Sequence, residues 1–248
     1  MKNLIASLPQ QINEAIQIGE STDFTPSTRK INAILVCGLG GSGIGGKIIG
    51  QLFSNELTVP FATVNDYDIP AWVDENTLII ASSYSGNTEE TIAAVKEGEK
   101  RNAFIAVITS GGELLAMAKQ HNWNHFVVPG GEQPRAMLAY SLVQQMYILV
   151  GAGLVDKKIL TQLKDVPAFL TEHTQLVQKE AEKTARAFVG KQPIIYAGSY
   201  FEGIAVRFRQ QINENGKMLC WHHILPEMTH NELVGWAGGS DHFAPIFL

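Results

Sequence analysis

The chain has 248 residues, enough for one large or two modest domains, and its 45% hydrophobic and 17% charged residues describe an ordinary folded protein. A net charge of −5 and the lack of a basic run argue against a nucleic-acid-binding surface. The N-terminus has no apolar signal-peptide core and no apolar run is long enough to span a membrane, so we expect a cytoplasmic protein without membrane contact.

Strand-like apolar runs alternate with helix-like segments through the first 150 residues. The predicted strands are Ala33–Cys37, Phe61–Val64, Thr77–Ala81, Ala103–Ile108 and Phe126–Val128. The predicted helices are Leu4–Ile18 (one or two short helices around Pro9), Ile44–Phe53, Thr88–Lys100, Glu113–Gln120 and Met137–Val150. This alternation predicts an α/β fold with a mainly parallel sheet, helices on both faces, and a ligand beyond the carboxyl ends of the strands.

The first of these strands runs into a glycine-rich turn, V-C-G-L-G-G-S-G-I-G-G-K, from Val36 to Lys47. A strand that leads through small residues into a helix offers backbone N–H groups and the positive end of the helix dipole to an anion, most often phosphate. A tight turn that binds nothing is the plainer alternative.

Two nucleotide motifs compete for the same turn. Gly38-x-Gly40-x-x-Gly43 fits the dinucleotide fingerprint, and Asp66 follows at about the distance of a ribose contact. The run that starts at Gly41 also fits most of a P-loop, but Ile48 stands where Ser or Thr would hold magnesium. The glycines alone therefore leave the ligand open.

The third strand leads into a second small-residue turn, A-S-S-Y-S-G-N-T-E-E, which separates these alternatives. The hydroxyls of Ser82, Ser83, Ser85 and Thr88 can donate to phosphate oxygens. A nucleotide fold has no need of such a cup after its third strand, whereas a small phosphorylated ligand does. The two turns together predict a phosphate cradle.

Arg135 is the single cation of the loop Gly130–Ala136, which precedes a long apolar helix. Because this loop follows a strand, Arg135 can reach the same cleft, although a solvated surface charge is the commoner role of a loop arginine. The two cysteines, Cys37 and Cys220, fall on predicted strands without metal-ligand spacing, so we expect buried free thiols and no metal site.

The second part of the chain starts with a charged helical arm from Asp156 to Val189, interrupted at Pro167. A further strand–turn–helix pattern follows. Its predicted elements are the strand Pro193–Ala197, the turn Gly198–Tyr200, the helix Phe201–Asn213, the strand Lys217–Trp221, a polar loop with a short helix, and the strand His242–Leu248. About three strands without a last covering helix predict an incomplete sheet, by truncation or by completion from a partner.

Five ordered motifs resemble a known family: G-L-G-G-S-G-I-G-G, S-Y-S-G-N-T-E-E-T, P-R-A-M-L, N-E-N-G-K and P-E-M-T-H-N-E-L-V-G-W. The chain from about residue 33 to its end is similar to the bifunctional phosphoglucose/phosphomannose isomerases, which carry sugar isomerase (SIS) domains. The resemblance implies two SIS-type αβα sandwich domains, with residues 1–153 as the N-terminal domain, 154–190 as a helical connector and 191–248 as a partial second domain.

The resemblance also implies roles for individual residues. A sugar 6-phosphate would be held by Gly41, Ser42, Ser83, Ser85 and Thr88. Glu214, in N-E-N-G-K, would be the base that moves a proton between C1 and C2, and Arg135 would stabilise the charge of the cis-enediol intermediate. His230, in T-H-N-E, would assist ring opening from the neighbouring subunit of a homodimer. Family members continue past Leu248 with a helix that carries a lysine used in ring opening.

These roles agree with the chemistry of an aldose–ketose interconversion, which needs a base, an electrophile and an acid–base group at the ring oxygen, and neither metal nor cofactor. From the residues alone, Glu214 is more often a solvated carboxylate, and His222 or His223 would serve as well as His230. The leading hypothesis is a glucose 6-phosphate and mannose 6-phosphate isomerase. The alternatives are a non-catalytic SIS module that senses a sugar phosphate and a nucleotide-binding oxidoreductase.

Overall fold

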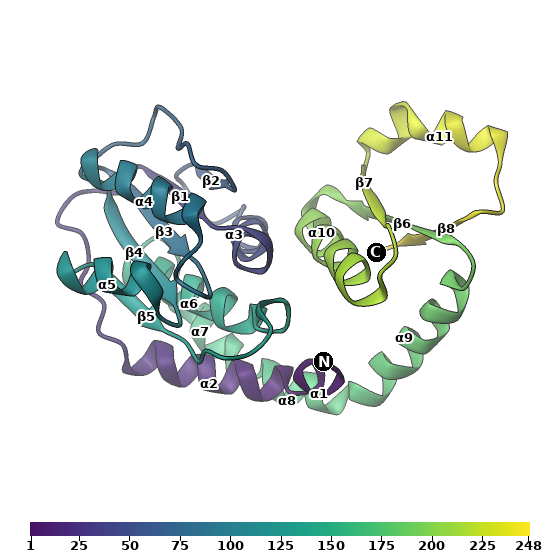
Figure 1. Ribbon diagram of the computed structural model, residues 1–248, viewed down its shortest axis with the longest axis horizontal. Helices are drawn as coiled ribbons and strands as arrows, with labels where there is room; N and C mark the ends of the chain where they lie inside the picture. Colours follow the sequence, from purple (N-terminus) through teal and green to yellow (C-terminus); the bar gives the residue numbers. More distant parts are fainter. The chain divides into compact units, whose positions relative to one another are not determined.

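The computed structural model describes residues 1–248, which form two compact units, Met1–Leu170 and Thr171–Leu248 (Figure 1). The boundary between the units lies inside the helix α8 (Val166–Glu172). It therefore falls within the segment 154–190, which is largely helical as expected. The division into residues 1–153, 154–190 and 191–248 stays a prediction.

Unit 1 is built on a five-stranded sheet with the order β2-β1-β3-β4-β5, and all its neighbouring strands pair in parallel. The strands are β1 (Ala33–Cys37), β2 (Phe61–Val64), β3 (Thr77–Ser82), β4 (Phe104–Thr109) and β5 (Asn124–Val127). The other helices are α1 (Lys2–Ala6), α2 (Leu8–Ser21), α3 (Gly40–Leu52), α4 (Glu89–Lys100), α5 (Gly112–Gln120), the 3₁₀ turn η1 (Pro134–Ala136), α6 (Leu138–Gly151) and α7 (Lys158–Leu163). The predicted α/β class and parallel sheet are confirmed.

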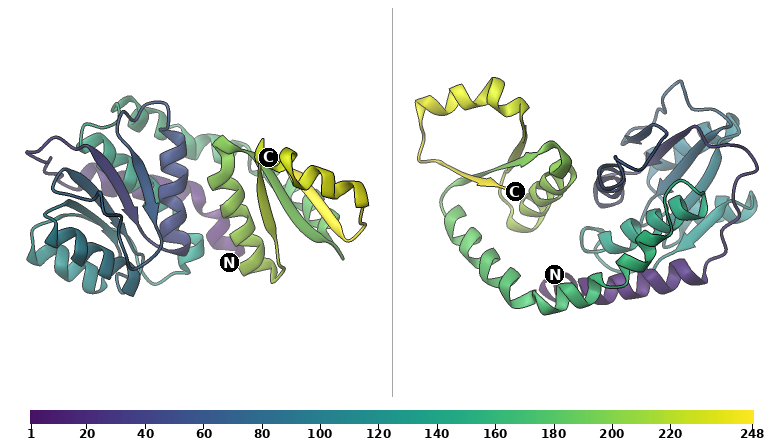
Figure 2. Two further views of the ribbon diagram at one scale, coloured as in Figure 1. Left: turned by 90° about the horizontal axis from the view of Figure 1, so that it is seen from above. Right: turned by 180° about the vertical axis from the view of Figure 1, so that it is seen from behind.

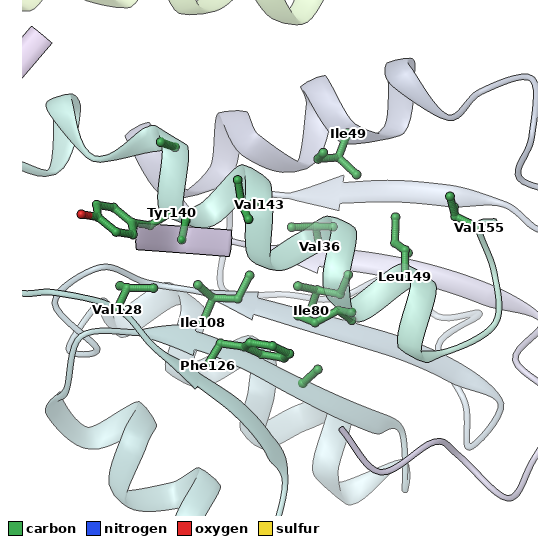
Figure 3. Packing of buried hydrophobic residues seen from close by; sticks show 14 of the residues in the cluster. Val36, Ile49, Ile80, Ile108, Phe126, Val128, Tyr140, Val143, Leu149 and Val155 are labelled. Atoms are coloured by element: carbon green, nitrogen blue, oxygen red, sulfur yellow. The ribbon is translucent and has the colours of Figure 1, made fainter. Parts of the chain in front are cut away.

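Helices cover both faces of this sheet because successive side chains of each strand point to opposite sides. On β1, Ile34 and Val36 belong to the core under α2, α3 and α6, whereas Leu35 and Cys37 belong to the core under α4 and α5. Figure 3 shows α6 lying over the first of these cores. Each fully buried aliphatic side chain contributes about 1.5–3 kcal/mol, so the strand ends are held rigidly.

Unit 2 has a three-stranded parallel sheet with the order β7-β6-β8. Its elements are α9 (Thr174–Phe188), β6 (Gln192–Gly198), η2 (Ser199–Phe201), α10 (Glu202–Gln211), the π-helical turn η3 (Ile212–Gly216), β7 (Trp221–Leu225), η4 (Glu227–His230), α11 (Glu232–Gly235), η5 (Trp236–Gly238) and β8 (Phe243–Phe247). The helix α10 packs on one face of the sheet, and the segment from η4 to η5 packs on the other (Figure 2).

One predicted strand of unit 2 is wrong. The strand expected at Lys217–Trp221 starts only at Trp221 and runs to Leu225, because the left-handed backbone of Lys217 (φ +55°) closes the preceding π turn. The helix expected at Phe201–Asn213 is confirmed, because α10 ends at Gln211 and continues directly into the π-helical turn η3. Cys220 consequently lies just before β7 and not on a strand, although both cysteines are buried and free as expected. No helix has the length and apolarity needed to cross a membrane.

Candidate active site

The turn between β1 and α3 is shaped by close backbone contacts at two glycines. A β-carbon on Gly43 would lie 2.2 Å from the carbonyl oxygen of Gly38, and one on Gly38 would lie 2.6 Å from that of Ser82. Gly40 has a left-handed backbone (φ +52°) and no atom within 4 Å of the place of a β-carbon. Gly40 and Gly43 belong to the first turn of α3, which is packed tightly against the sheet at Gly43, is open at Gly40 and has no side-chain cap. Its first N–H groups can serve a ligand.

The hydroxyl groups of the second turn differ in their surroundings. Ser83 is buried: its Oγ lies 2.8 Å from Thr88 Oγ1 and accepts a hydrogen bond from Gly86 N at 3.1 Å. Ser85 is exposed, and its Oγ accepts from Asn87 N at 3.3 Å. Thr88 is half-buried at the N-cap of α4, where no side chain caps the helix. Ser83 therefore supports the loop, while Ser85 and Thr88 lie where a ligand can reach them.

The structure brings these two turns together at one edge of the sheet. Their strands β1 and β3 are neighbours, and the backbone N–H of Tyr84 donates to Ser42 Oγ at 3.2 Å. The neighbouring strand β4 holds the second turn from the other side, since Ser110 Oγ donates to the carbonyl of Tyr84 at 2.6 Å. We call Gly41, Ser42, Ser83, Ser85 and Thr88 the cradle.

Arg135 lies beside the cradle, in the short turn η1. A β-carbon on Gly41 would be 3.2 Å from the carbonyl oxygen of Pro134 and 3.9 Å from Arg135 Cα, so the two backbones are in contact. Arg135 is half-buried, and its Nη1 donates to Gln133 Oε1 at 3.0 Å. A small cavity between η1 and α3 is lined by residues that include Gly41, Ser42 and Pro134. The backbone of Arg135 therefore lies beside the cradle.

Glu214 lies on unit 2, in the π-helical turn η3 that follows α10. Its side chain is exposed, and its carbonyl accepts from Lys217 Nζ at 2.7 Å. Burial lowers the pKa of Arg207, and the negative charge of Glu214 opposes that effect, so the carboxylate lies within electrostatic reach of a buried guanidinium. Turns of π-helix are frequent at functional sites because they re-aim a side chain at the end of a helix.

His230 is the exposed last residue of η4, also on unit 2. The following residue, Asn231, caps α11 by accepting the N–H of Glu232 at 2.5 Å. The sequence could not rank His230 above the other histidines of this segment. The structure separates them, because His223 Nδ1 lies 2.5 Å from Glu232 Oε2, whereas His230 projects into solvent.

Glu232 is a residue that sequence reasoning missed. It accepts from the Tyr196 hydroxyl, which in turn accepts from Trp236 Nε1 at 2.8 Å. Burial, together with the bond to Glu232, raises the pKa of Tyr196 to about 12, so this hydroxyl stays a neutral donor. The sequence held one indication of this contact, which is a tyrosine inside an otherwise apolar strand. A buried phenol needs a polar partner. No group of three or more His, Cys, Asp or Glu side chains is placed to hold a metal ion.

Comparison with known proteins identifies the lineage. The family model of the SIS domain matches residues 28–152, and that of the bacterial phospho-glucose isomerase C-terminal SIS domain matches residues 177–248. A bifunctional phosphoglucose/phosphomannose isomerase of Caldicellulosiruptor bescii is 36% identical over 238 residues, which are 93% of this chain and 70% of that protein. The chain belongs to this family. The predicted resemblance to the bifunctional phosphoglucose/phosphomannose isomerases is thus confirmed.

Two further matches concern a curated protein with a different name and a solved structure with a similar fold. A D-glucosamine-6-phosphate 4-epimerase of Sulfolobus acidocaldarius is 31% identical over 225 residues, 90% of this chain and 70% of that protein. The C-terminal domain of glucosamine-fructose-6-phosphate aminotransferase from Francisella tularensis has a TM-score of 0.77 at 18% identity, covering 98% of this chain and 74% of that one. At this identity the second match shows a shared fold alone.

Proposed function

We propose that this chain is an aldose–ketose isomerase that interconverts glucose 6-phosphate, and also mannose 6-phosphate, with fructose 6-phosphate. The observation that carries the proposal is the junction of the two turns, in which Tyr84 N–H donates to Ser42 Oγ. This bond joins a glycine turn and a hydroxyl turn into one concave site with two uncapped helix N-termini, which suits a single phosphate group. The C. bescii relative, named for this pair of activities, supports the substrate class.

In this proposal the phosphate is held chiefly by neutral donors. None of the five cradle residues carries a positive charge, so the anion is stabilised by the N–H groups of α3 and α4, with hydroxyl donors from Ser42, Ser85 and Thr88. Ser83 contributes through its bonds to Thr88 and Gly86, which fix the loop. Such a site recognises the phosphate and leaves the sugar end of the substrate for catalytic side chains.

Proton transfer is assigned to three further residues. Glu214 takes the proton from C2 of the open-chain aldose and returns it to C1, and Arg135 stabilises the negative oxygen of the cis-enediolate between these steps. His230 donates a proton to the ring oxygen while the C1 hydroxyl loses one, which opens the ring. Each acid–base group positioned in this way typically contributes about 10²–10⁴-fold in rate.

The first test is a coupled assay for fructose 6-phosphate, run in chelator from each sugar phosphate separately. We expect turnover of both, and a loss of at least about 10²-fold in kcat for Glu214→Gln with phosphate binding retained. Glu180→Gln, which changes an exposed carboxylate on α9, is the matched control. Full activity of Glu214→Gln would refute the assignment of the base.

Two outcomes would replace the proposed function. A protein that is stabilised against heat by glucose 6-phosphate but turns over neither sugar would be the non-catalytic SIS module. Conversion at C4 of glucosamine 6-phosphate, the reaction for which the S. acidocaldarius relative is named, would place the chain with that relative.

We also propose that the chain forms a homodimer in which His230 completes the partner's site, and that unit 2 is a partial SIS-type domain covered on assembly. Its sheet leaves Trp221 51% and Phe247 62% exposed, which supports an apolar surface that a partner covers. Mixing Glu214→Gln with His230→Ala should then restore about one quarter of the wild-type activity, because half of the random dimers are mixed and each has one intact site. No recovery, or a monomer by light scattering, would contradict the shared site.

A further inference from the structure

The segment that carries His230 is attached to the sheet of unit 2 on both sides of this histidine. On the N-terminal side, Met228 is 3% exposed and packs with Ile194 and Tyr196. On the C-terminal side, the attachment is Glu232, two residues beyond His230. The histidine thus lies on a short arch between an apolar anchor and a polar one.

Glu232, the polar anchor, contacts two different strands, one through each of its carboxylate oxygens. The Tyr196 hydroxyl, from β6, donates to Oε1, and His223 Nδ1, from β7, lies 2.5 Å from Oε2. Trp236 Nε1 donates to Tyr196 and fixes its hydroxyl from the far side. Hydrogen bonds to a charged acceptor are shorter and stronger than neutral ones, so Glu232 joins the arch firmly to two neighbouring strands.

Glu232 supplies the only carboxylate in the lining of the adjoining pocket. The space next to Glu232 is a pocket of about 260 Å³, lined also by Ile194, Trp236, Ser240 and Phe243. The only side-chain hydroxyl of the lining belongs to Ser240, and its Oγ already accepts from His242 N at 3.2 Å. Loss of the carboxylate therefore releases the arch on its C-terminal side.

We propose that Glu232 is a positioning residue, which fixes His230 in the orientation needed for ring opening by tying α11 to Tyr196 and His223. The proposal rests on the proposed function in one respect, the role of His230. The effect of Glu232 on the reaction passes through His230 alone.

Activity tests this dependence through a double-mutant cycle. Glu232→Ala should lower kcat about 10²-fold, as expected for misplacing a catalytic group by about 1 Å, and leave KM nearly unchanged. Glu232→Gln keeps an acceptor oxygen and should retain most of the activity. Asp241→Ala, which removes an exposed carboxylate on the same unit, is the matched control. The variant His230→Ala/Glu232→Ala should be no slower than His230→Ala alone. Losses that multiply in the double variant would overturn the proposal, since a merely structural defect adds to the loss of the histidine.

Amide hydrogen exchange tests the attachment without any turnover. In Glu232→Ala the amides of residues 229–231 should exchange about tenfold faster than in the wild type, and in Asp241→Ala they should not. Unchanged exchange in Glu232→Ala would overturn the proposal even in an active enzyme. If the alanine variant does not fold, Tyr196→Phe removes one of the two bonds and should give a smaller change in the same direction. Absence of wild-type turnover would refute the isomerase function, and the exchange rates would still decide whether Glu232 holds the arch.

Discussion

Replacing Gly86 with alanine should destabilise unit 1 by about 2–5 kcal/mol, because two independent costs meet at this residue. Gly86 has φ +72°, a conformation that costs an L-residue about 1–2 kcal/mol. A β-carbon would also lie 1.8 Å from the carbonyl oxygen of Gly111. Relief would require one backbone to move away from the other, which typically costs about 1–3 kcal/mol.

The loop cannot relax easily because both polar groups of Gly86 are engaged. Its N–H donates to Ser83 Oγ at 3.1 Å, and its carbonyl accepts from Leu114 N at 2.9 Å. The strain should therefore reach Ser83 and the cradle. Under the proposed function, Gly86→Ala should also weaken the protection that glucose 6-phosphate gives against heat. For a unit of this size, each kcal/mol corresponds to about 2–4 °C in Tm.

Urea denaturation followed by circular dichroism measures the cost, with Gly131→Ala as the matched control. Gly131 also has a left-handed backbone (φ +90°) but no atom within 4 Å of the place of a β-carbon. It carries only the conformational cost of about 1–2 kcal/mol. Because the gain from stiffening the unfolded chain is the same for both variants, the difference between them isolates the contact with Gly111. Equal losses in the two variants would refute the steric argument.

Two further predictions concern buried polar groups. The Tyr140 hydroxyl donates to Glu14 Oε2 at 2.6 Å and holds the pKa of Glu14 below its ordinary value of 4.5. The stability that this bond contributes is present above pH 4.5 and disappears as the pH falls through the lowered pKa. Tyr140→Phe should therefore lower the free energy of unfolding by about 1.5 kcal/mol at pH 7 and by clearly less near pH 3. Equal losses at both pH values, measured by urea denaturation, would exclude this linkage. Burial raises the pKa of Cys37 to about 12 and that of Cys220 to about 11. Iodoacetamide at pH 8 should therefore label both thiols slowly in the native protein and rapidly in urea, which mass spectrometry can measure. Rapid labelling of native Cys37 would contradict its burial.

The sheet of unit 1 was predictable because its central strands are buried on both faces. All the residues of β1 and β3 are buried, and such strands have to be short apolar runs bounded by turns. The strand β7 was not predictable in the same way. It lies at an edge of its sheet and includes His222 and His223, which are half-buried, so its sequence W-H-H-I-L lacks the apolar pattern. The strand was predicted instead on the more apolar residues just before it.

The candidate site was likewise predictable only in part. The chemistry of the cradle is local, since glycines and hydroxyls lie within single strand–turn–helix segments, and their types alone indicated an anion. What the sequence could not supply were the contacts between distant residues. Ser83 turned out to be a buried support for its loop, and the bond from Tyr196 to Glu232 spans 36 residues. The turn at Glu214 was expected as an ordinary helix end, because a π-helical turn has no distinct composition.

The contacts of Gly38, Gly43 and Gly86 bear on how proteins of this lineage can diverge. At each of these positions a side chain would collide with a main-chain oxygen, whatever its chemical character. Descendants that act on a different sugar, or at a different carbon, are therefore expected to inherit these three glycines unchanged. A change of substrate or of reaction is then expected to come from substitutions among the side chains that face the sugar. The main-chain part of the proposed phosphate site can persist through changes of reaction, because its shape depends on the absence of side chains at these glycines.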